Sequence, residues 1–441
     1  MRRLCFVLGA VCLTACGDDG PAADDSGSTT AATTGTTGPG SSSTSGGEST
    51  AGSSGGEASS TGDDESGDST TTGSQGCPDA LPPANRVRQV IVALPFDEAG
   101  GQARRYGRLE LDEDGNLSEV VQEFEMGRAF EGPIVFTPDG RFGVVPQTPV
   151  VDSNDSASLG VFRVADDGVV DVLDPGFVGD FYPSKITMAA DGRTVWVIDS
   201  AFEDAGGGVY EVELDCDGTL IDHGRVLPGR LVSGLLFTPQ GNAILSAIQM
   251  PGVTPGPQGF LFAWPGEDAP LSTADMLGHT DAVVEATALT PDGGLFAIAD
   301  NSTFAPVSNQ VGFVQIDGET LVGAGAIEVF NPYELVASPF DDVLLVASGE
   351  SNTIYVLDYT PGGTPALSMR GPLEAADGQP VSLPGKATMV RRGDLEGLVL
   401  WAQDGGIRRI QLGGDGQVTD LGVHSPGSGL AWIVGGIGVQ P

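Results

Sequence analysis

Basic residues are scarce in this sequence of 441 residues. Lysine and arginine together number 20 against 60 aspartates and glutamates, so the formal net charge is −40. The only lysines are Lys185 and Lys386. A surface this acidic repels phosphate backbones, which argues against nucleic acid as a partner. The charge suits a high-salt environment or divalent cations, or it simply keeps the protein soluble.

Histidine and cysteine are also rare, at three and five residues. The histidines His223, His279 and His424 do not have the spacing of a metal cluster. The part of the chain that can fold, residues 77–441, contains neither the Gly-x-Ser-x-Gly elbow nor the His-Glu-x-x-His motif. The acid-rich stretches 112–116 and 152–155 leave calcium as a weak alternative, but hairpin turns explain them better. We therefore expect no metal and no cofactor.

Long apolar segments are absent too. The apolar run 4–13 follows Arg2 and Arg3 and is too short to span a bilayer as a mature helix. It ends in Leu13-Thr-Ala-Cys16, which resembles the lipobox of bacterial lipoproteins. The resemblance implies that residues 1–15 are a signal peptide and that Cys16 is lipidated and anchors the protein in a membrane. An ordinary signal peptide that is cut near residue 15 is the alternative.

Residues 16–76 comprise Cys16 and a tract made almost entirely of Gly, Ser, Thr, Ala, Asp and Glu. The tract has no aromatic or large aliphatic side chain, so it cannot bury enough apolar surface to fold. We expect a disordered tether with a root-mean-square span of roughly 40 Å. The residues after Cys16 are Gly-Asp-Asp, which favours the outer over the inner membrane of a cell envelope.

Two cysteines remain in the part of the chain that can fold. Cys5 and Cys12 lie in the signal peptide, which leaves Cys77 and Cys216. A pair of cysteines in an exported domain favours one disulfide over two free thiols. The entropic model values the closure of so long a loop at roughly 4–5 kcal/mol as an upper estimate. Two ligands alone are too few for structural zinc.

Residues 77–441 repeat a unit of about fifty residues. Each unit reads as an apolar strand, a Pro/Asp/Gly turn and further short strands, and no segment has helical periodicity. Corresponding turns are 52, 49, 52, 48 and 52 residues apart, which is typical of propeller blades. The segments that contain the end of the first strand and the turn are 134–140, 186–192, 235–241, 287–293, 335–341 and, in degenerate form, 387–393.

Six copies occupy residues 131–423, and the two ends of the domain supply a seventh. The stretches 89–93 and 106–111 read as second and third strands, and Gly429–Val434 reads as the missing first strand. Joining both ends in one blade hides the open edges of the ring. The sequence therefore predicts an all-β domain, a seven-bladed propeller closed by N- and C-terminal strands, and we expect a monomer.

The repeats resemble those of the YVTN and lactonase-like group of seven-bladed propellers. The resemblance rests on turns such as Ile134-Val-Phe-Thr-Pro-Asp-Gly140. The string Tyr-Val-Thr-Asn itself is absent, and the nearest strings are Trp196-Val-Ile-Asp199 and Ala297-Ile-Ala-Asp-Asn301. The group includes hydrolases, but no catalytic set can be transferred to this chain, so the catalytic residues are unknown.

Charged residues recur at one position of the repeat. Lys185, Lys386 and Glu334 all lie six residues before the turn aspartate or its equivalent, and Glu285 and Glu131 lie one or two residues earlier. We expect these five side chains at the mouth of the central channel. They either bind a small molecule or form a structural ring of salt bridges, and the structural interpretation is the simpler one.

Two functions remain open at this level. The first is a lipid-anchored binding or interaction module of the cell envelope, with an envelope protein or a small molecule as its partner. The second is a lactonase-like or other hydrolase whose site lies at the channel mouth. The clear scaffold without a clear catalytic constellation favours the first, non-enzymatic function.

Overall fold

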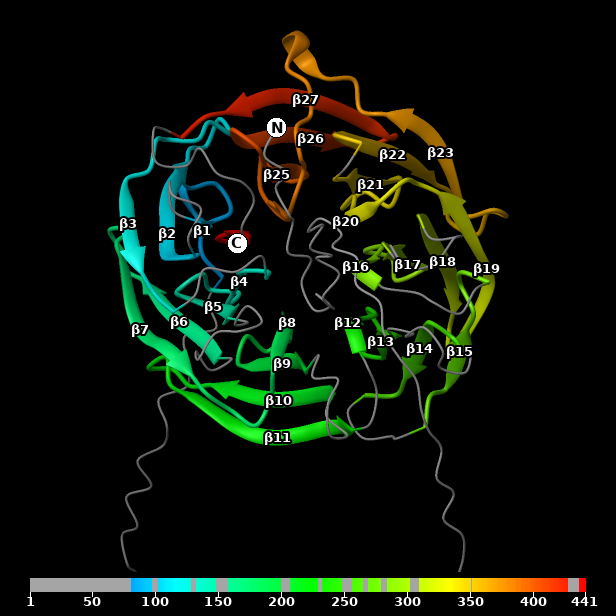
Figure 1. Cartoon of the computed structure of the whole chain (residues 1–441), viewed down its shortest axis with the longest axis horizontal. Helices are drawn as coiled ribbons and strands as arrows, with labels where there is room; N and C mark the ends of the chain where they lie inside the picture. The colour runs from blue at the N-terminus through cyan, green and yellow to red at the C-terminus, as the bar shows by residue number, and fades with distance from the viewer. Residues whose placement is uncertain are drawn as a thin grey trace, which may run out of the picture. The chain divides into compact units, whose positions relative to one another are not determined.

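The computed structural model describes the repeat domain and not the N-terminal eighty residues. The described residues are 81–96, 102–127, 132–147, 158–199, 207–228, 232–247, 256–264, 269–278, 284–301, 309–349, 351–426 and 436–441. They form seven four-stranded antiparallel sheets, arranged as the blades of a propeller around a central axis (Figure 1). The predicted fold is therefore confirmed.

The first three blades follow one another from the N-terminal side. Their strands, from the axis outwards, are β28 (Ile437–Val439), β1 (Arg88–Phe96), β2 (Gln102–Leu111) and β3 (Gln122–Glu125) in blade 1; β4 (Val135–Phe136), β5 (Phe142–Gln147), β6 (Ser158–Val164) and β7 (Val170–Phe177) in blade 2; and β8 (Pro183–Met188), β9 (Thr194–Asp199), β10 (Gly208–Leu214) and β11 (Leu220–Pro228) in blade 3.

The other four blades repeat the same order. Their strands are β12 (Val232–Phe237), β13 (Ala243–Ala247), β14 (Gly259–Phe262) and β15 (Ser272–Ala274) in blade 4; β16 (Val284–Leu289), β17 (Leu295–Asp300), β18 (Gln310–Asp317) and β19 (Thr320–Glu328) in blade 5; β20 (Pro332–Ala337), β21 (Val343–Ser348), β22 (Thr353–Tyr359) and β23 (Leu367–Pro372) in blade 6; and β24 (Ala387–Met389), β25 (Leu398–Gln403), β26 (Gly406–Gly413) and β27 (Gln417–His424) in blade 7. A short 3₁₀ helix, η1 (Ala376–Gly378), precedes β24.

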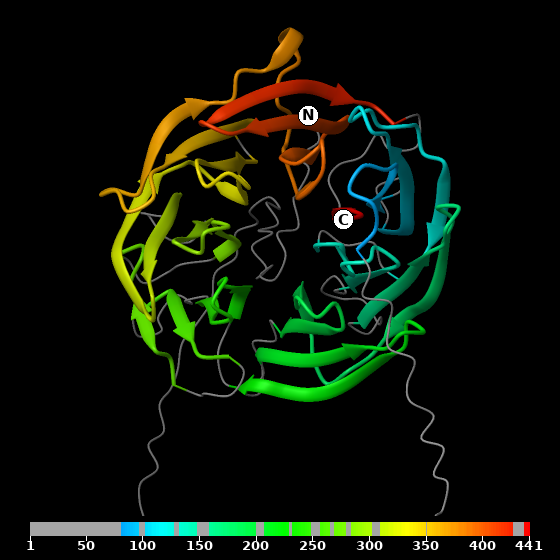
Figure 2. The same cartoon turned by 180° about the vertical axis from the view of Figure 1, so that it is seen from behind.

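Side chains along the second strand of a blade point alternately to the two neighbouring blades, which explains why the blades pack into a ring. In β17, Phe296 and Ile298 pack against blade 4, whereas Ala297 and Ala299 pack against blade 6. Successive side chains of a strand point to opposite faces, so a strand with apolar residues at every position is buried on both. The buried apolar residues accordingly form seven clusters, one for each pair of neighbouring blades. Figure 2 shows the same closed ring from behind.

The Thr-Pro-Asp-Gly turn has both a local role and a role between blades. In blade 5, Thr290 donates to the Asp292 carboxylate at 2.5 Å and accepts from the Leu295 amide at 2.9 Å. Gly293 adopts a φ of +71°, and a Cβ there would lie 2.4 Å from Cδ of Pro239 in the turn of blade 4. Glycine is required because it tolerates both this conformation and the close approach of the proline ring.

Blade 1 is built from strands of both ends of the domain, as predicted, but its first strand is not the predicted one. The innermost strand is β28, which pairs with β1 through Val90–Val439 and Val92–Ile437. The predicted segment 429–434 falls in the range 427–435, outside the described residues. Gly438 helps β28 to occupy the innermost position, because only a residue without a side chain fits against blade 2 there. A Cβ on Gly438 would lie 2.5 Å from the Ile134 carbonyl oxygen.

Four of the innermost strands share an irregularity. The pairing of β8, β12, β16 and β20 with their second strands slips by one residue at Ser184, Ser233, Glu285 and Tyr333. A β-bulge of this kind inserts one extra residue and redirects the side chains beside it. All four bulges lie near the start of the strand, at the end of the ring where the predicted channel-mouth residues lie.

No helix of the described residues is both long and apolar enough to cross a membrane.

Candidate functional site at the propeller axis

Lys185 reaches from its own blade across the two that follow. It is the third residue of β8, and its ammonium donates to the carbonyl oxygens of Ser233 at 2.7 Å and Glu285 at 2.5 Å. Blades 4 and 5 approach closely here, because a Cβ on Gly234 would lie 2.5 Å from Cγ2 of Thr287. One ammonium can therefore bridge the innermost strands of both blades.

Lys386 and Glu334 form an ion pair between blades 7 and 6. Their charged atoms are 3.0 Å apart, and the side chains are 14% and 17% exposed. The ammonium of Lys386 also lies 4.2 Å from the ring centroid of Tyr333, within range of a cation–π interaction. This pair satisfies both of its charges, as the structural interpretation of the channel mouth requires.

Glu285 is different, because no described residue donates a hydrogen bond to its carboxylate or pairs with it. It occupies the bulge of β16, where it is partly buried. Burial raises the pKa of this carboxyl, while the positive charges of Lys386 and Lys185 oppose the rise. A carboxylate that lies among cations without a hydrogen-bonded partner is energetically costly, so it is a candidate contact for a ligand.

Among the described residues, Lys185 has no carboxylate partner either. Burial, and then repulsion by Lys386, lower the pKa of its ammonium to about 8, against the attraction of Glu285 and Glu334. The amine is therefore partly neutral near pH 8, which makes it able to donate a hydrogen bond or accept a proton there.

We call Lys185, Glu285, Glu334 and Lys386 the axial charge cluster. The structure brings these four predicted residues within electrostatic range of one another. The fifth, Glu131, lies outside the described residues. Sequence reasoning missed Tyr333, although an aromatic residue directly before Glu334 in the aligned repeats was a usable signal.

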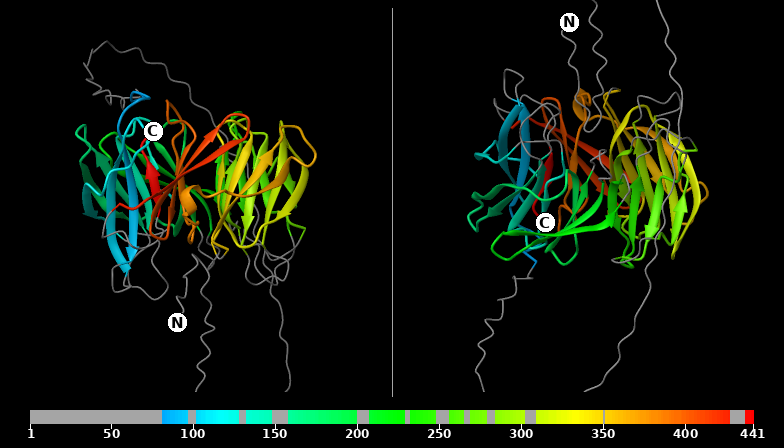
Figure 3. Two further views of the ribbon diagram at one scale, coloured as in Figure 1. Left: turned by 90° about the horizontal axis from the view of Figure 1, so that it is seen from above. Right: turned by 60° about the horizontal axis from the view of Figure 1, so that its bottom comes forward.

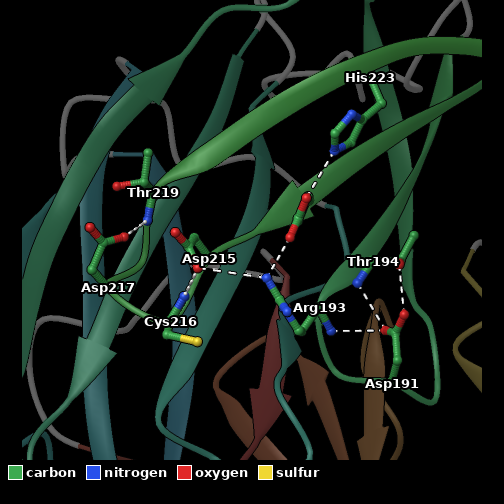
Figure 4. Close-up of polar contacts among 9 residues, drawn as sticks. Asp191, Arg193, Thr194, Asp215, Cys216, Asp217, Thr219 and His223 are labelled. Carbon is green, nitrogen blue, oxygen red and sulfur yellow. Dashed lines mark hydrogen bonds and ion pairs between the residues drawn. The ribbon is translucent and has the colours of Figure 1, made fainter. Parts of the chain in front are cut away.

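Of the two cysteines of the predicted disulfide, only Cys216 lies in the described part of the chain. Cys216 lies in the turn between β10 and β11, where its amide donates to Asp215 at 2.7 Å (Figure 4). In the same view Arg193 pairs with Glu213 and lies 3.6 Å from Asp215. Cys77, like Cys16, falls outside the described part of the chain.

The described histidines lie on the outer strands. His223 contacts Glu213 at 3.0 Å on the surface of blade 3. His424 ends β27, the outermost strand of blade 7, where its ring nitrogen lies 2.9 Å from the Ser118 carbonyl oxygen. His424 therefore lies on the outer edge of its blade and not at the axis. His279 lies outside the described residues.

The first acid-rich stretch is a hairpin turn. The Asp112 carboxylate accepts the amides of Asp114 at 3.0 Å and Asn116 at 2.7 Å. Within the described ranges, no three His, Cys, Asp or Glu side chains are arranged to hold a metal ion. The second stretch, 152–155, is not described.

Comparison with known proteins shows the fold. No protein-family profile matches the chain, and no curated protein matches it. Among solved structures, the periplasmic gluconolactonase of Pseudomonas aeruginosa is 15% identical with a TM-score of 0.57, and the alignment covers 80% of this chain and 99% of that one. A Lactobacillus plantarum protein is 12% identical with a TM-score of 0.56 over 80% and 99% of the two chains. A candidate 6-phosphogluconolactonase from Bacteroides uniformis is 15% identical with a TM-score of 0.54 over 76% and 96%. The chain thus shares the propeller fold of lactonase-like structures.

Proposed function

We propose that this protein is a lipid-anchored envelope protein whose propeller binds a small polar molecule at the axial charge cluster. One observation supports this best: Lys185 and Glu285 lie in the same cluster but do not pair with each other. Lys185 is held by backbone carbonyls, and no described residue forms a hydrogen bond or an ion pair with the Glu285 carboxylate. A purely structural ring would pair these charges as it pairs Lys386 with Glu334.

The arrangement favours a ligand with both an acidic group and hydroxyl groups. The ammonium groups of Lys185 and Lys386 attract a carboxylate or phosphate, and Glu285 accepts hydrogen bonds from hydroxyls. The Tyr333 ring beside Lys386 provides an apolar surface for the carbon skeleton. Sugar acids and small hydroxy acids have this chemistry.

The test is a titration of the full chain with gluconate, galacturonate, citrate and glycerol, followed by calorimetry and thermal melting. We expect an acidic polyol to bind and to raise Tm, and Lys386→Met or Glu285→Gln to weaken binding at least tenfold. Arg163→Gln is the matched control, because Arg163 is an exposed cation that is paired with Asp171 on the outer strands. Equal affinity in Lys386→Met and in the control would refute the site.

The two lysines offer a second, direct readout. Reductive ¹³C-methylation labels Lys185 and Lys386 and any free N-terminal amine, so few NMR signals report on the whole protein. A ligand at the cluster should shift the signals of both lysines. Binding that shifts neither signal would place the ligand elsewhere and favour an envelope protein partner on the outer strands.

Lactone hydrolysis is the second candidate. The lowered pKa of Lys185, about 8, suits a group that takes a proton from water near neutral pH, and Glu285 lies beside it. The gluconolactonase of Pseudomonas aeruginosa shares this fold, though at 15% identity. We expect turnover of gluconolactone above the spontaneous rate, lost in both Lys185→Met and Glu285→Gln, if this candidate is correct. Turnover that survives in both variants would reject it.

The anchoring is proposed from the sequence. Cys16 carries the lipid, and the outer membrane is the expected location. Metabolic labelling with a fatty acid should mark the protein and should fail with Cys16→Ala. Labelling of the variant would refute the lipobox.

A further inference from the structure

Three arginines gather at the opposite end of the ring from the axial charge cluster. Arg86 and Arg88 lie at the start of β1, and Arg392 lies in the turn between β24 and β25. Lys386 directly precedes β24, the innermost strand of blade 7, and Arg392 follows it, so the two residues lie at opposite ends of that strand. Figure 3 shows the ring from its side, with strands running between its two faces. We call Arg86, Arg88 and Arg392 the closure arginines.

The chain brings these residues together where the ring closes. Arg88 is 1% exposed and donates to the carbonyl oxygens of Ala84 and, at 3.0 Å, Arg392. Arg86 donates to an oxygen of Pro441, the last residue of the sequence, at 3.2 Å. The approach of the chain is close, because a Cβ on Gly393 would lie 2.6 Å from the Ala84 carbonyl oxygen.

The closure arginines differ in how they are partnered. Arg88 donates to backbone carbonyls, and Arg86 lies beside Pro441 and within range of the Asp139 charge, whereas no described carboxylate forms an ion pair with Arg392. Burial and the neighbouring arginines lower the pKa of Arg86 and Arg88, with Asp139 opposing the effect on Arg86. The nearby Asp394 carboxylate is engaged by the Asn85 amide at 2.8 Å.

Among the closure arginines, the guanidinium of Arg392 gives the most specific evidence of a ligand. Its Nε and Nη2 are both buried and have no hydrogen-bond partner. These two groups form one edge of the guanidinium plane, which binds two oxygens of a carboxylate or phosphate side by side. Buried donors without a partner among the described residues indicate a missing ligand, and the cationic edge of Arg392 favours an anion.

We propose that the closure arginines form a binding site for a phosphate-type anion, separate from the axial charge cluster. Free inorganic phosphate and the phosphate monoester of a lipid headgroup share this chemistry. Because the site joins blade 7 to the segment that precedes β1, the bound anion stabilises closure of the ring.

The test compares the Tm of the full chain in phosphate, in glycerol phosphate and in chloride at equal ionic strength. We expect phosphate, glycerol phosphate or both to raise Tm by about 2–4 °C in the wild type and in Arg163→Gln. Arg392→Gln should abolish the shift, and Arg392→Lys, which keeps the charge but not the fork, should reduce it. A shift with inorganic phosphate identifies a free anion as the ligand, and a shift with glycerol phosphate alone identifies a headgroup.

Two outcomes would overturn the proposal. One is a Tm that does not differ between phosphate and chloride, and the other is an equal shift in wild type and Arg392→Gln. If Arg392→Gln does not fold, Arg86→Gln takes its place. The shift must also persist in Lys386→Met, which separates this site from the axial charge cluster at the other end of the ring.

Discussion

Removal of β28 should open the propeller. Ile437 and Val439 are 3% and 9% exposed, and burial of each stabilises the fold by about 1.5–3 kcal/mol. The hydrogen bonds from Ala93 to Gly436 at 2.8 Å and from Gln440 to Gln89 at 2.9 Å add about 1 kcal/mol each. Deletion of residues 436–441 therefore costs about 5–8 kcal/mol, comparable to the roughly 5–15 kcal/mol that stabilises a whole domain.

A single substitution measures the same contact more gently. Ile437→Ala should cost about 2–5 kcal/mol, because the side chain fills the space between blades 1 and 7. The assay is urea unfolding of the full chain, followed by fluorescence and circular dichroism. Leu421→Ala is the control, because that leucine is 42% exposed on the outermost strand of blade 7 and should cost less than about 0.5 kcal/mol.

The reasoning would be refuted by either of two results. Ile437→Ala could unfold at the same urea concentration as Leu421→Ala. The chain without residues 436–441 could keep the cooperative transition of the full chain. Either result would mean that the blades close without their C-terminal strand.

The remaining predictions concern buried charge and the disulfide. Arg408 and Asp420 form an ion pair that is 0% and 1% exposed, so Arg408→Met alone should cost about 3–5 kcal/mol in urea unfolding, whereas Arg408→Met with Asp420→Leu should cost much less; equal costs would contradict this account. The lowered pKa of Lys185 means that its protonated form destabilises the fold below about pH 8. Relative to Lys185→Met, the wild type should therefore gain stability, at most about 3 kcal/mol, as pH rises from 8 to 10.5, and a flat difference would show an ordinary lysine. Non-reducing peptide mapping should find Cys77 joined to Cys216, and reductant should lower Tm; two alkylated thiols without reduction would show that the bond is absent.

Most of the strands could be predicted from the residues of each segment alone. The second and third strands of the repeats follow from apolar runs between Gly, Pro and Asp, because each such strand is buried between two neighbouring blades. The Thr-Pro-Asp-Gly turn is recognisable for a partly local reason, since the Asp292 carboxylate accepts the amide of Gly294 and Gly293 has a φ of +71°. The repeat length then predicted blades, and the terminal strands predicted closure.

The strand that closes the ring, β28, could not be predicted from the residues of its own segment. Gly429–Val434 has the stronger apolar pattern, yet Ile437–Val439 pairs with β1. The two partners are separated by almost the whole domain, and the register depends on the contact of Gly438 with blade 2. No periodicity within one segment contains that information.

The sequence by itself determined the repeat, the number of blades, and the position at which charged residues meet the axis. Only the tertiary structure decided how those charges are partnered. The bulge in β16 places the Glu285 carbonyl, and not its carboxylate, against Lys185, while the register of β20 pairs Glu334 with Lys386. The physical reason is that a blade's position along the axis and the approach of its neighbours, as at Gly234 and Thr287, are set by packing between segments far apart in the chain.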